Sequence, residues 1–127
     1  MTTEPPGRHF HAQVTRDGQV TILTVSGELD VSTVRNLADT ARPVAESAEA
    51  GLVVDLSDVR FLASSAITEL VRTHEHLPAA ATMALVAVNN QVVLPIQLSG
   101  IDRVMSTFAS IPAAVAYIRD RAQAARS

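Results

Sequence analysis

Two adjacent hydroxyl side chains, Ser64 and Ser65, lie between a strand-like and a helix-like stretch of the sequence. The first turn of a helix carries unpaired backbone N–H groups and the positive end of the helix dipole. A serine hydroxyl there can cap the helix, and a phosphate can be held by the same N–H groups. Capping explains one serine of the pair, so the other is a candidate for function.

The four histidines form two His-x-His pairs, His9 with His11 and His74 with His76. On a strand the first pair would share a face, whereas on a helix the second pair would point about 200° apart. A metal site would require both pairs to converge. The glycine-rich patterns that hold nucleotides, GxxxxGK[ST] and GxGxxG, are absent from the sequence. We therefore predict no metal site and no cofactor.

A hydrolytic triad could be drawn from Ser65, His74 and Asp30, but Ser65 lacks the GxSxG turn that exposes a nucleophile. His74 would lie more than about two helical turns beyond Ser65, too far along the axis to contact it. Asp55 and Asp58, near the predicted end of a strand, are interpreted as turn and cap residues. We predict that the protein is not an enzyme.

The stretches on either side of the two serines predict the elements that position them. Residues 52–56 form a nearly continuous apolar run bounded by Ser57 and Asp58, the pattern of a strand covered on both faces. From Ile67 to Leu77 the apolar positions recur at spacings of three and four, with His74 on the same stripe. This spacing predicts an amphipathic helix that begins at the serines.

The first part of the chain predicts a β-hairpin. Residues 10–15 alternate between apolar and polar side chains, as in a half-buried strand, and residues 20–25 form a second, β-branched strand. Asp17 and Gly18 suit the tight turn between them.

A polar break at residues 26–30 then leads to a helix from Val31, for which Asp30 or Ser32 is the expected cap. Pro43 is expected to end or kink this helix near Ala41, and a further helical turn up to Ala48 is left open. The remaining predicted elements are a strand at 83–88, a helix from Asn89 or Asn90 to Gly100 that Pro95 shortens or distorts, a short strand within 101–108, and a final helix opening at Ser110.

Strands that alternate with helices after a hairpin predict an α/β fold. We expect a mixed sheet of four to five strands, parallel in its centre, with about four helices and right-handed crossovers. The length of 127 residues fits one domain. We expect residues 10–122 to form that domain, residues 1–9 a flexible N-terminus and residues 123–127 a frayed C-terminal tail.

Composition excludes several classes of function. The net charge of −3, with scattered arginines, argues against nucleic-acid binding. The absence of cysteine excludes disulfides, thiolate metal sites and a cysteine nucleophile. No apolar run is long enough to cross a bilayer, and the first residues do not form a signal peptide. We expect a soluble cytoplasmic protein with no membrane or nucleic-acid partner.

Three segments in a fixed order carry a family likeness: SGELD at Ser26–Asp30, VVDLSDVRFLASSAITEL at Val53–Leu70, and NNQVVLPIQLSGIDRV at Asn89–Val104. With this order and spacing the chain resembles the STAS-domain anti-sigma factor antagonists, small bacterial regulators of partner-switching modules. The resemblance covers residues 14–119 and implies the STAS-like fold.

The resemblance implies a binding switch that regulates transcription. In that family the unphosphorylated antagonist binds an anti-sigma factor that is also a serine kinase, and this frees a sigma factor. Phosphorylation of a serine at the start of the second helix disrupts the complex. The family pattern there is Asp-Ser-Ser/Thr-Gly, and its modified hydroxyl corresponds to Ser65, with Ser64 as the second choice. Ala63 and Ala66 replace the Asp and the Gly of the pattern.

The same resemblance places Asp30 close to the modified serine. The predicted partner-binding residues are Glu28, Asp30, Ser64, Ser65, Thr68 and Arg72. Two regulatory versions stay open, a phosphorylatable variant with an altered kinase preference and an antagonist regulated in another way. The alternative function is a STAS-like ligand-sensing or scaffold module without kinase control. The sequence leaves weak self-association and the identity of the anti-sigma factor open.

Overall fold

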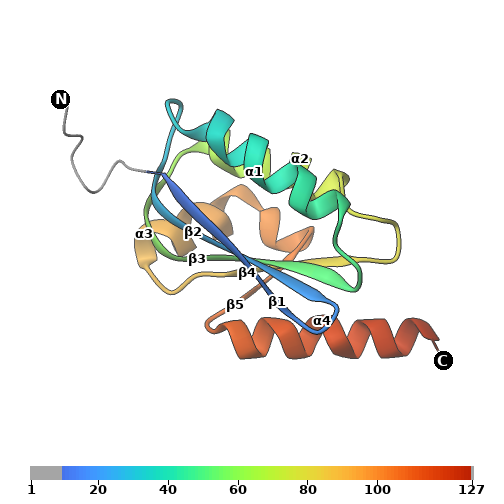
Figure 1. Cartoon of the computed structure of the whole chain (residues 1–127). Coiled ribbons are helices and arrows are strands. Elements are labelled where there is room, and N and C mark those ends of the chain that lie inside the picture. The colour runs from blue at the N-terminus through green and yellow to red at the C-terminus, as the bar shows by residue number, and fades with distance from the viewer. Residues whose placement is uncertain (1–9, 127) are drawn as a thin grey trace.

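A five-stranded sheet lies between helices on both of its faces in the computed structural model, which describes residues 10–126 (Figure 1). The strand order is β1-β2-β3-β4-β5, with β1 antiparallel to β2 and all other neighbours parallel. In chain order the elements are β1 (His11–Asp17), β2 (Val20–Leu29), α1 (Val34–Glu46), β3 (Gly51–Leu62), α2 (Ser64–Glu75), β4 (Thr82–Val86), α3 (Asn90–Ser99), the short 3₁₀ helix η2 (Ile101–Arg103), β5 (Ser106–Phe108) and α4 (Ile111–Arg126). The predicted α/β fold with a mixed sheet is confirmed.

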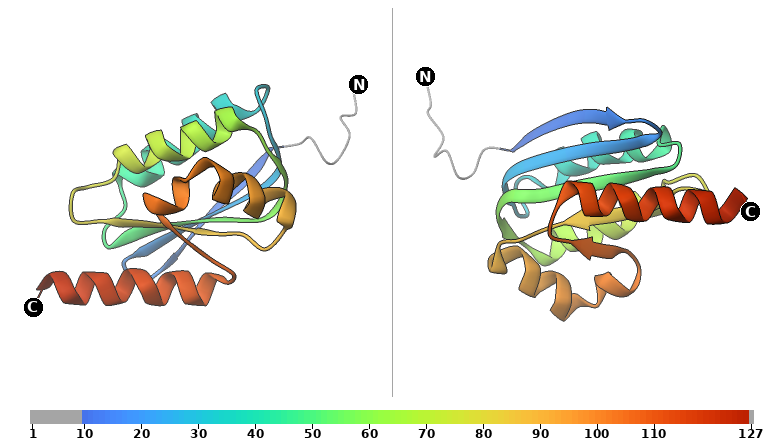
Figure 2. Two further views of the ribbon diagram at one scale, coloured as in Figure 1. Left: turned by 180° about the vertical axis from the view of Figure 1, so that it is seen from behind. Right: turned by 90° about the horizontal axis from the view of Figure 1, so that it is seen from below.

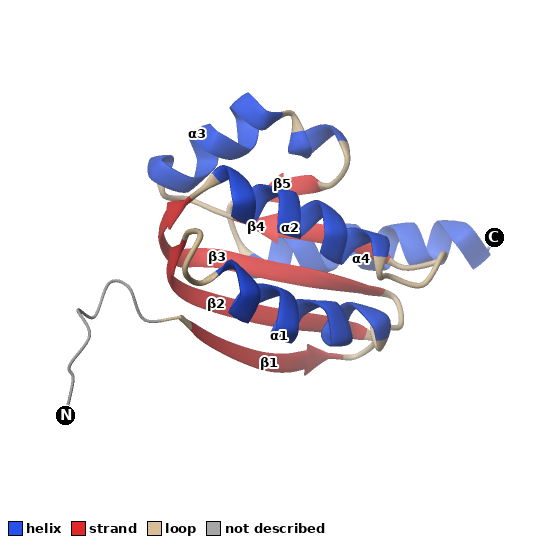
Figure 3. Ribbon diagram, turned by 90° about the horizontal axis from the view of Figure 1, so that it is seen from above, coloured by secondary structure: helices blue, strands red, loops and turns tan. Residues whose placement is uncertain are grey.

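Helices α1, α2 and α3 cover one face of the sheet, and α4 crosses the other (Figures 2 and 3). Alternate residues of the central strands supply the two cores. On β3, Leu52 and Val54 belong to the core beneath α1–α3, whereas Val53 belongs to the core beneath α4. A strand buried on both faces reads as an unbroken apolar run, which is why residues 52–56 were recognisable in the sequence.

Strand β1 is an edge strand whose seven residues are all exposed, so the predicted half-burial is wrong. The helices lie over the neighbouring strands and leave β1 without a covering layer (Figure 3). The hairpin itself is confirmed. Its two-residue loop is Gly18–Gln19, because Asp17 pairs with Val20. Gly18 has a φ of 64°, the left-handed conformation that glycine supplies in tight turns.

Strands β2 and β3 both extend well beyond the positions that the sequence predicted. The polar break at 26–30 is the end of β2, and β3 continues through Ser57 and Asp58 to Leu62. The two strands stay paired in parallel across two register shifts, one at 24/26 and one at 27/28. Such bulges interrupt the alternation of apolar and polar side chains, so the period-based prediction stopped early.

Helix α1 begins at Val34, three residues later than predicted, and continues through Pro43 to Glu46. Pro43 lies on the exposed face, and the buried face consists of Leu37, Ala41 and Ala45. Packing of that face against the sheet maintains the helix past the proline, so the helix does not end near Ala41 and the alternative of a further turn beyond Pro43 holds.

The boundaries of α3 agree with the prediction. The Asn89 side chain accepts a hydrogen bond from the backbone N–H of Gln91, and Gly100 ends the helix with a φ of 79°. The helix runs through Pro95 without interruption. Strand β4 ends at Val86, two residues before the predicted end, and β5 lies within the predicted 101–108 stretch.

The final helix continues to Arg126, so residues 123–126, which were expected to fray, are helical. The expected flexible N-terminus, residues 1–9, lies outside the described residues. Across residues 10–126, none of the helices combines the length and the apolarity that crossing a bilayer would need.

Candidate functional site

The ends of β2 and β3 bring two of the three family-like segments together. Glu28 and Leu29 pair with Phe61 and Leu62 in the parallel register. The backbone N–H of Ala63 donates to the carbonyl oxygen of Leu29 at 2.8 Å. The loop before α1 and the first turn of α2 therefore meet at one end of the sheet.

Neither serine caps α2. The cap position belongs to Ala63, which has an extended backbone and no side-chain oxygen to offer, so Ser64 and Ser65 are the first two residues of the helix. The prediction that one serine acts as a cap is wrong. The helix begins one residue earlier than the side-chain types suggested, because the carbonyl of Ala63 accepts from the backbone N–H groups of Ala66 and Ile67 at 3.0 and 3.1 Å.

The two serine hydroxyls have different environments. Ser64 is exposed, whereas the Oγ atom of Ser65 is buried and has no hydrogen-bond partner within the described chain. A buried polar atom without a partner costs about 1–3 kcal/mol. The family resemblance ranked Ser65 before Ser64, but the sequence could not predict which hydroxyl is buried, since the direction of each depends on how the first turn of α2 packs.

Asp30 orders the loop before α1. One carboxylate oxygen accepts from Ser32 N at 2.9 Å, Ser32 Oγ at 2.6 Å and Thr33 N at 3.2 Å. The hydrogen bond from the Ser32 hydroxyl is the main cause that lowers the pKa of Asp30, so its carboxylate is charged at neutral pH. The N-cap of α1 is Thr33, so neither Asp30 nor Ser32 occupies the predicted cap position. No hydrogen bond joins Asp30 to either serine of α2 within residues 10–126.

Three of the predicted partner-binding residues form one exposed stripe. Ser64, Thr68 and Arg72 follow one another at intervals of four on α2, and all three are exposed. Thr68 Oγ1 donates to the backbone oxygen of Ser64 at 3.1 Å. Ser65 lies outside this stripe, and Glu28 is partly exposed at the neighbouring end of β2.

The stripe borders a hollow that we call the α2 groove, with a volume of about 480 Å³ between α2 and the end of α3. Its lining is mostly apolar and comprises Ser64, Ile67, Thr68, Val71, Ser99, Gly100, Ile101 and Val104. A second hollow of about 600 Å³ is lined by Glu28, Arg60, Phe61, Asn90, Gln91, Leu94 and Pro95.

Large apolar side chains are exposed in the lining of these hollows, namely Phe61 at 48%, Leu94 at 53% and Val104 at 51%, and Leu98, one helical turn after Leu94 on α3, is 86% exposed. Grouped exposed apolar side chains are typical of a surface that binds another molecule. The contribution of α3 and η2 to this apolar surface was not predicted from the sequence. The available signal was Leu94 and Leu98, two large apolar residues at a spacing of four within the predicted helix.

A buried carboxylate connects α2 to α1. Glu69 is 5% exposed and accepts from Arg42 Nε at 2.9 Å, from Arg42 Nη2 at 2.6 Å and from Thr73 Oγ1 at 3.1 Å. The Glu69 carboxylate is the main cause that raises the pKa of Arg42. Sequence analysis did not identify this contact, because it joins residues far apart in the chain.

The histidines do not form a metal centre in the part of the chain that the structure describes. Within residues 10–126, no three side chains of His, Cys, Asp or Glu are grouped to hold a metal ion. His76 Nδ1 lies 3.1 Å from Glu46 Oε2, and His11 is on β1. His9 lies outside the described residues.

A mixed sheet with three helices on one face and one on the other is also the architecture of solved anti-sigma factor antagonists. The structure of an anti-sigma factor antagonist from Mycobacterium paratuberculosis matches with a TM-score of 0.85 and 28% identity, covering 92% of this chain and 99% of that one. SpoIIAA, a Bacillus cell fate determinant solved in its phosphorylated form, shares the fold at a TM-score of 0.62 and 18% identity, covering 87% and 99%.

The sequence comparisons agree with the fold. Residues 11–114 match the STAS domain family. The anti-sigma-F factor antagonist RsfB of Mycobacterium tuberculosis is 30% identical over 100 residues, which are 79% of this chain and 82% of that protein. The chain belongs to the STAS domain family.

Proposed function

We propose that this protein is an anti-sigma factor antagonist, which binds an anti-sigma factor in the bacterial cytoplasm and thereby releases a sigma factor for transcription. The proposal is supported by the RsfB relative and by the M. paratuberculosis structure, both named as such antagonists. The observation that carries it is the exposed stripe of Ser64, Thr68 and Arg72 beside the α2 groove. This role requires binding and no catalysis by the chain itself.

The proposed contact surface comprises the exposed stripe along α2 and the end of β2. Arg72 provides a guanidinium that can pair with a carboxylate of the partner, and arginine is enriched among residues that dominate binding energy. Glu28 and Asp30 contribute acceptors at the opposite border, next to Phe61. Apolar side chains between these charged groups would be covered by the anti-sigma factor.

Binding to the purified cognate anti-sigma factor tests the proposal. We expect Arg72→Glu to weaken binding at least about tenfold, equivalent to about 1.4 kcal/mol, in a calorimetric titration. The matched control is Arg121→Glu, the same charge reversal on α4, which covers the opposite face of the sheet. Equal affinities of Arg72→Glu and wild type would place the interface elsewhere.

The proposed switch is phosphorylation by a kinase-type anti-sigma factor at Ser65, with Ser64 as the second candidate. A phosphate adds about −1.5 to −2 charge, which would repel acidic groups nearby such as Asp30. SpoIIAA shows that a protein of this fold has a phosphorylated form. Because Ser65 Oγ is buried, its reaction requires the side chain to turn outward, whereas Ser64 is already exposed.

Incubation with the kinase and ATP, followed by mass spectrometry of wild type, Ser64→Ala and Ser65→Ala, distinguishes the two serines. Phosphate that persists in Ser64→Ala and disappears in Ser65→Ala would support Ser65. If neither serine is modified while the anti-sigma factor still binds, the alternative of a STAS-like sensing or scaffold module without kinase control gains support. Ala63 and Ala66, which replace the acid and the glycine of the family pattern, favour that alternative.

A further inference from the structure

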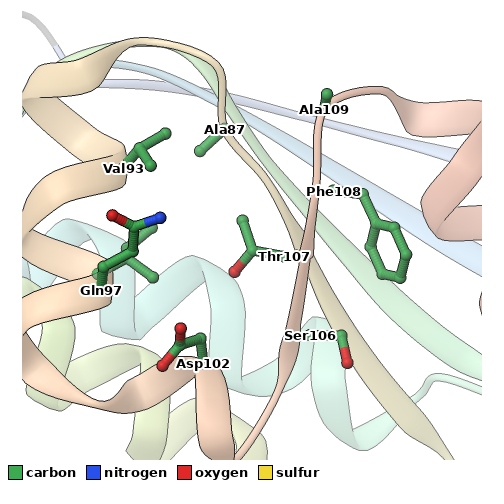
Figure 4. A pocket seen from close by; sticks show the side chains of 9 residues that line it. Ala87, Val93, Gln97, Asp102, Ser106, Thr107, Phe108 and Ala109 are labelled. Atoms are coloured by element: carbon green, nitrogen blue, oxygen red, sulfur yellow. The ribbon is translucent and has the colours of Figure 1, made fainter.

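A second kind of binding space lies on the other side of the α3–η2 segment from the α2 groove. It has a volume of about 460 Å³ and is enclosed by α3, η2 and β5 (Figure 4). We call it the polar hollow. Ligand pockets typically have volumes of about 300–1,000 Å³, with apolar walls and a few converging polar groups. The volume falls within that range, whereas the lining is more polar than is typical and consists of Ala87, Val93, Ile96, Gln97, Asp102, Ser106, Thr107, Phe108 and Ala109.

Three polar side chains from three different elements are directed into this space. Gln97 comes from α3, Asp102 from η2 and Thr107 from β5 (Figure 4). On β5 the residues alternate between faces, so Ser106 and Phe108 point toward α4 instead. The Ser106 hydroxyl lies 3.3 Å from the hydroxyl of Tyr117.

The hydrogen-bonding capacity of these three side chains is unused. Thr107 Oγ1 is buried and has no partner in the described chain, which is costly for a hydroxyl. Within residues 10–126, neither the Gln97 amide nor the Asp102 carboxylate forms a side-chain hydrogen bond or an ion pair. Gln97 and Asp102 are both exposed, so their polar groups are accessible to an entering ligand.

We infer that the polar hollow binds a small organic cation, a primary ammonium group on a short alkyl chain. An ammonium group has three N–H donors and no acceptor, which matches acceptor oxygens on Asp102, Gln97 and Thr107. Among the residues that the structure describes, Asp102 is the only charged one that lines the hollow, so a cation is favoured over a carboxylate or a phosphate. The alkyl part would lie against Val93 and Ile96. This site is separate from the proposed anti-sigma factor surface, and the inference does not rest on the proposed function.

Titration of the isotope-labelled chain by NMR, with n-butylammonium, n-butanol and butyrate as matched probes at equal ionic strength, tests the inference. We expect saturable amide shifts at Ala87, Asp102 and Thr107 with butylammonium, and none with the alcohol or the anion. An absence of saturable shifts, or equal shifts with butanol, would overturn it.

Two variants examine the named contacts. Asp102→Asn removes the charge and is expected to weaken butylammonium binding at least about tenfold, while Asp120→Asn, a matched change of an exposed acid on α4, leaves it unchanged. Thr107→Val removes only the hydroxyl and is expected to weaken binding about threefold to tenfold. Its melting temperature should equal or exceed that of wild type, which separates lost ligand contact from misfolding. Unchanged binding by Asp102→Asn contradicts the inference.

Discussion

Ser65 and Ser64 are adjacent in the sequence, yet only Ser64 presents its hydroxyl to solvent. From the sequence, both serines were candidates for capping or for function, and their predicted position at the start of a helix is correct. The sequence could not assign a direction to either hydroxyl, because Ala63 rather than a serine occupies the cap position. A buried hydroxyl without a partner is a cost to the fold, so Ser65 does not stabilise this region through its hydroxyl.

We predict that Ser65→Ala increases the free energy of unfolding by up to about 1–3 kcal/mol, because it removes a buried polar atom that has no partner. Ser64→Ala, at an exposed position, should change it by less than about 0.5 kcal/mol. Urea denaturation followed by circular dichroism measures both. Destabilisation by Ser65→Ala would show that the hydroxyl has a partner in solution.

At the scale of single elements, local rules predicted best where a boundary depends on nearby residues. Asn89 and Gly100 define α3 through one side-chain cap and one left-handed glycine. The same local rules failed where the boundary of an element depends on packing against residues far away in the chain. Strands β2 and β3 extend because they pair with each other across bulges, and α1 passes Pro43 because its apolar face is buried.

The contact of Arg42 with Glu69 joins two helices. It holds α1 against α2 and thereby positions the proposed binding stripe. We predict that Arg42→Met lowers the free energy of unfolding by about 1–3 kcal/mol, since it leaves a buried carboxylate with only the hydroxyl of Thr73 as a partner. The double variant Arg42→Met/Glu69→Met should recover part of the loss, because apolar side chains often replace a buried ion pair without penalty.

Chemical denaturation of wild type, both single variants and the double variant gives the coupling energy between Arg42 and Glu69. If the effects of the two single changes on the free energy of unfolding simply add, the two side chains contribute independently. Their contact then does not stabilise the packing of α1 against α2.

At the scale of the whole molecule, the sheet and α4 meet at Gly51, where β3 begins. A Cβ atom there would collide with the carbonyl oxygen of Thr82 and would lie 2.7 Å from Ile118 Cγ2. The sequence indicated Gly51 only as the entry to a strand. Its importance for packing depends on the close approach of β3, β4 and α4. This approach could not be predicted from the neighbours of Gly51 in the chain.

We predict that Gly51→Ala lowers the free energy of unfolding by about 1–3 kcal/mol, as overpacking typically does. Gly100→Ala is a useful contrast, since nothing lies within 4 Å of its Cβ position and only the left-handed backbone is strained. Its expected cost is about 1–2 kcal/mol. A thermal melt that shows no loss for Gly51→Ala would mean that β4 and α4 adjust easily.

The α3–η2 segment separates the α2 groove from the polar hollow and lines both of them. Ser99, Ile101 and Val104 line the α2 groove, whereas Gln97 and Asp102 of the same segment line the polar hollow. Ligands on opposite sides of one segment obey thermodynamic reciprocity. Whatever factor a cation in the hollow applies to the affinity for an anti-sigma factor, the anti-sigma factor must apply to the affinity for the cation. A cation bound in the hollow would in that case change the affinity for the partner without any covalent change to the protein.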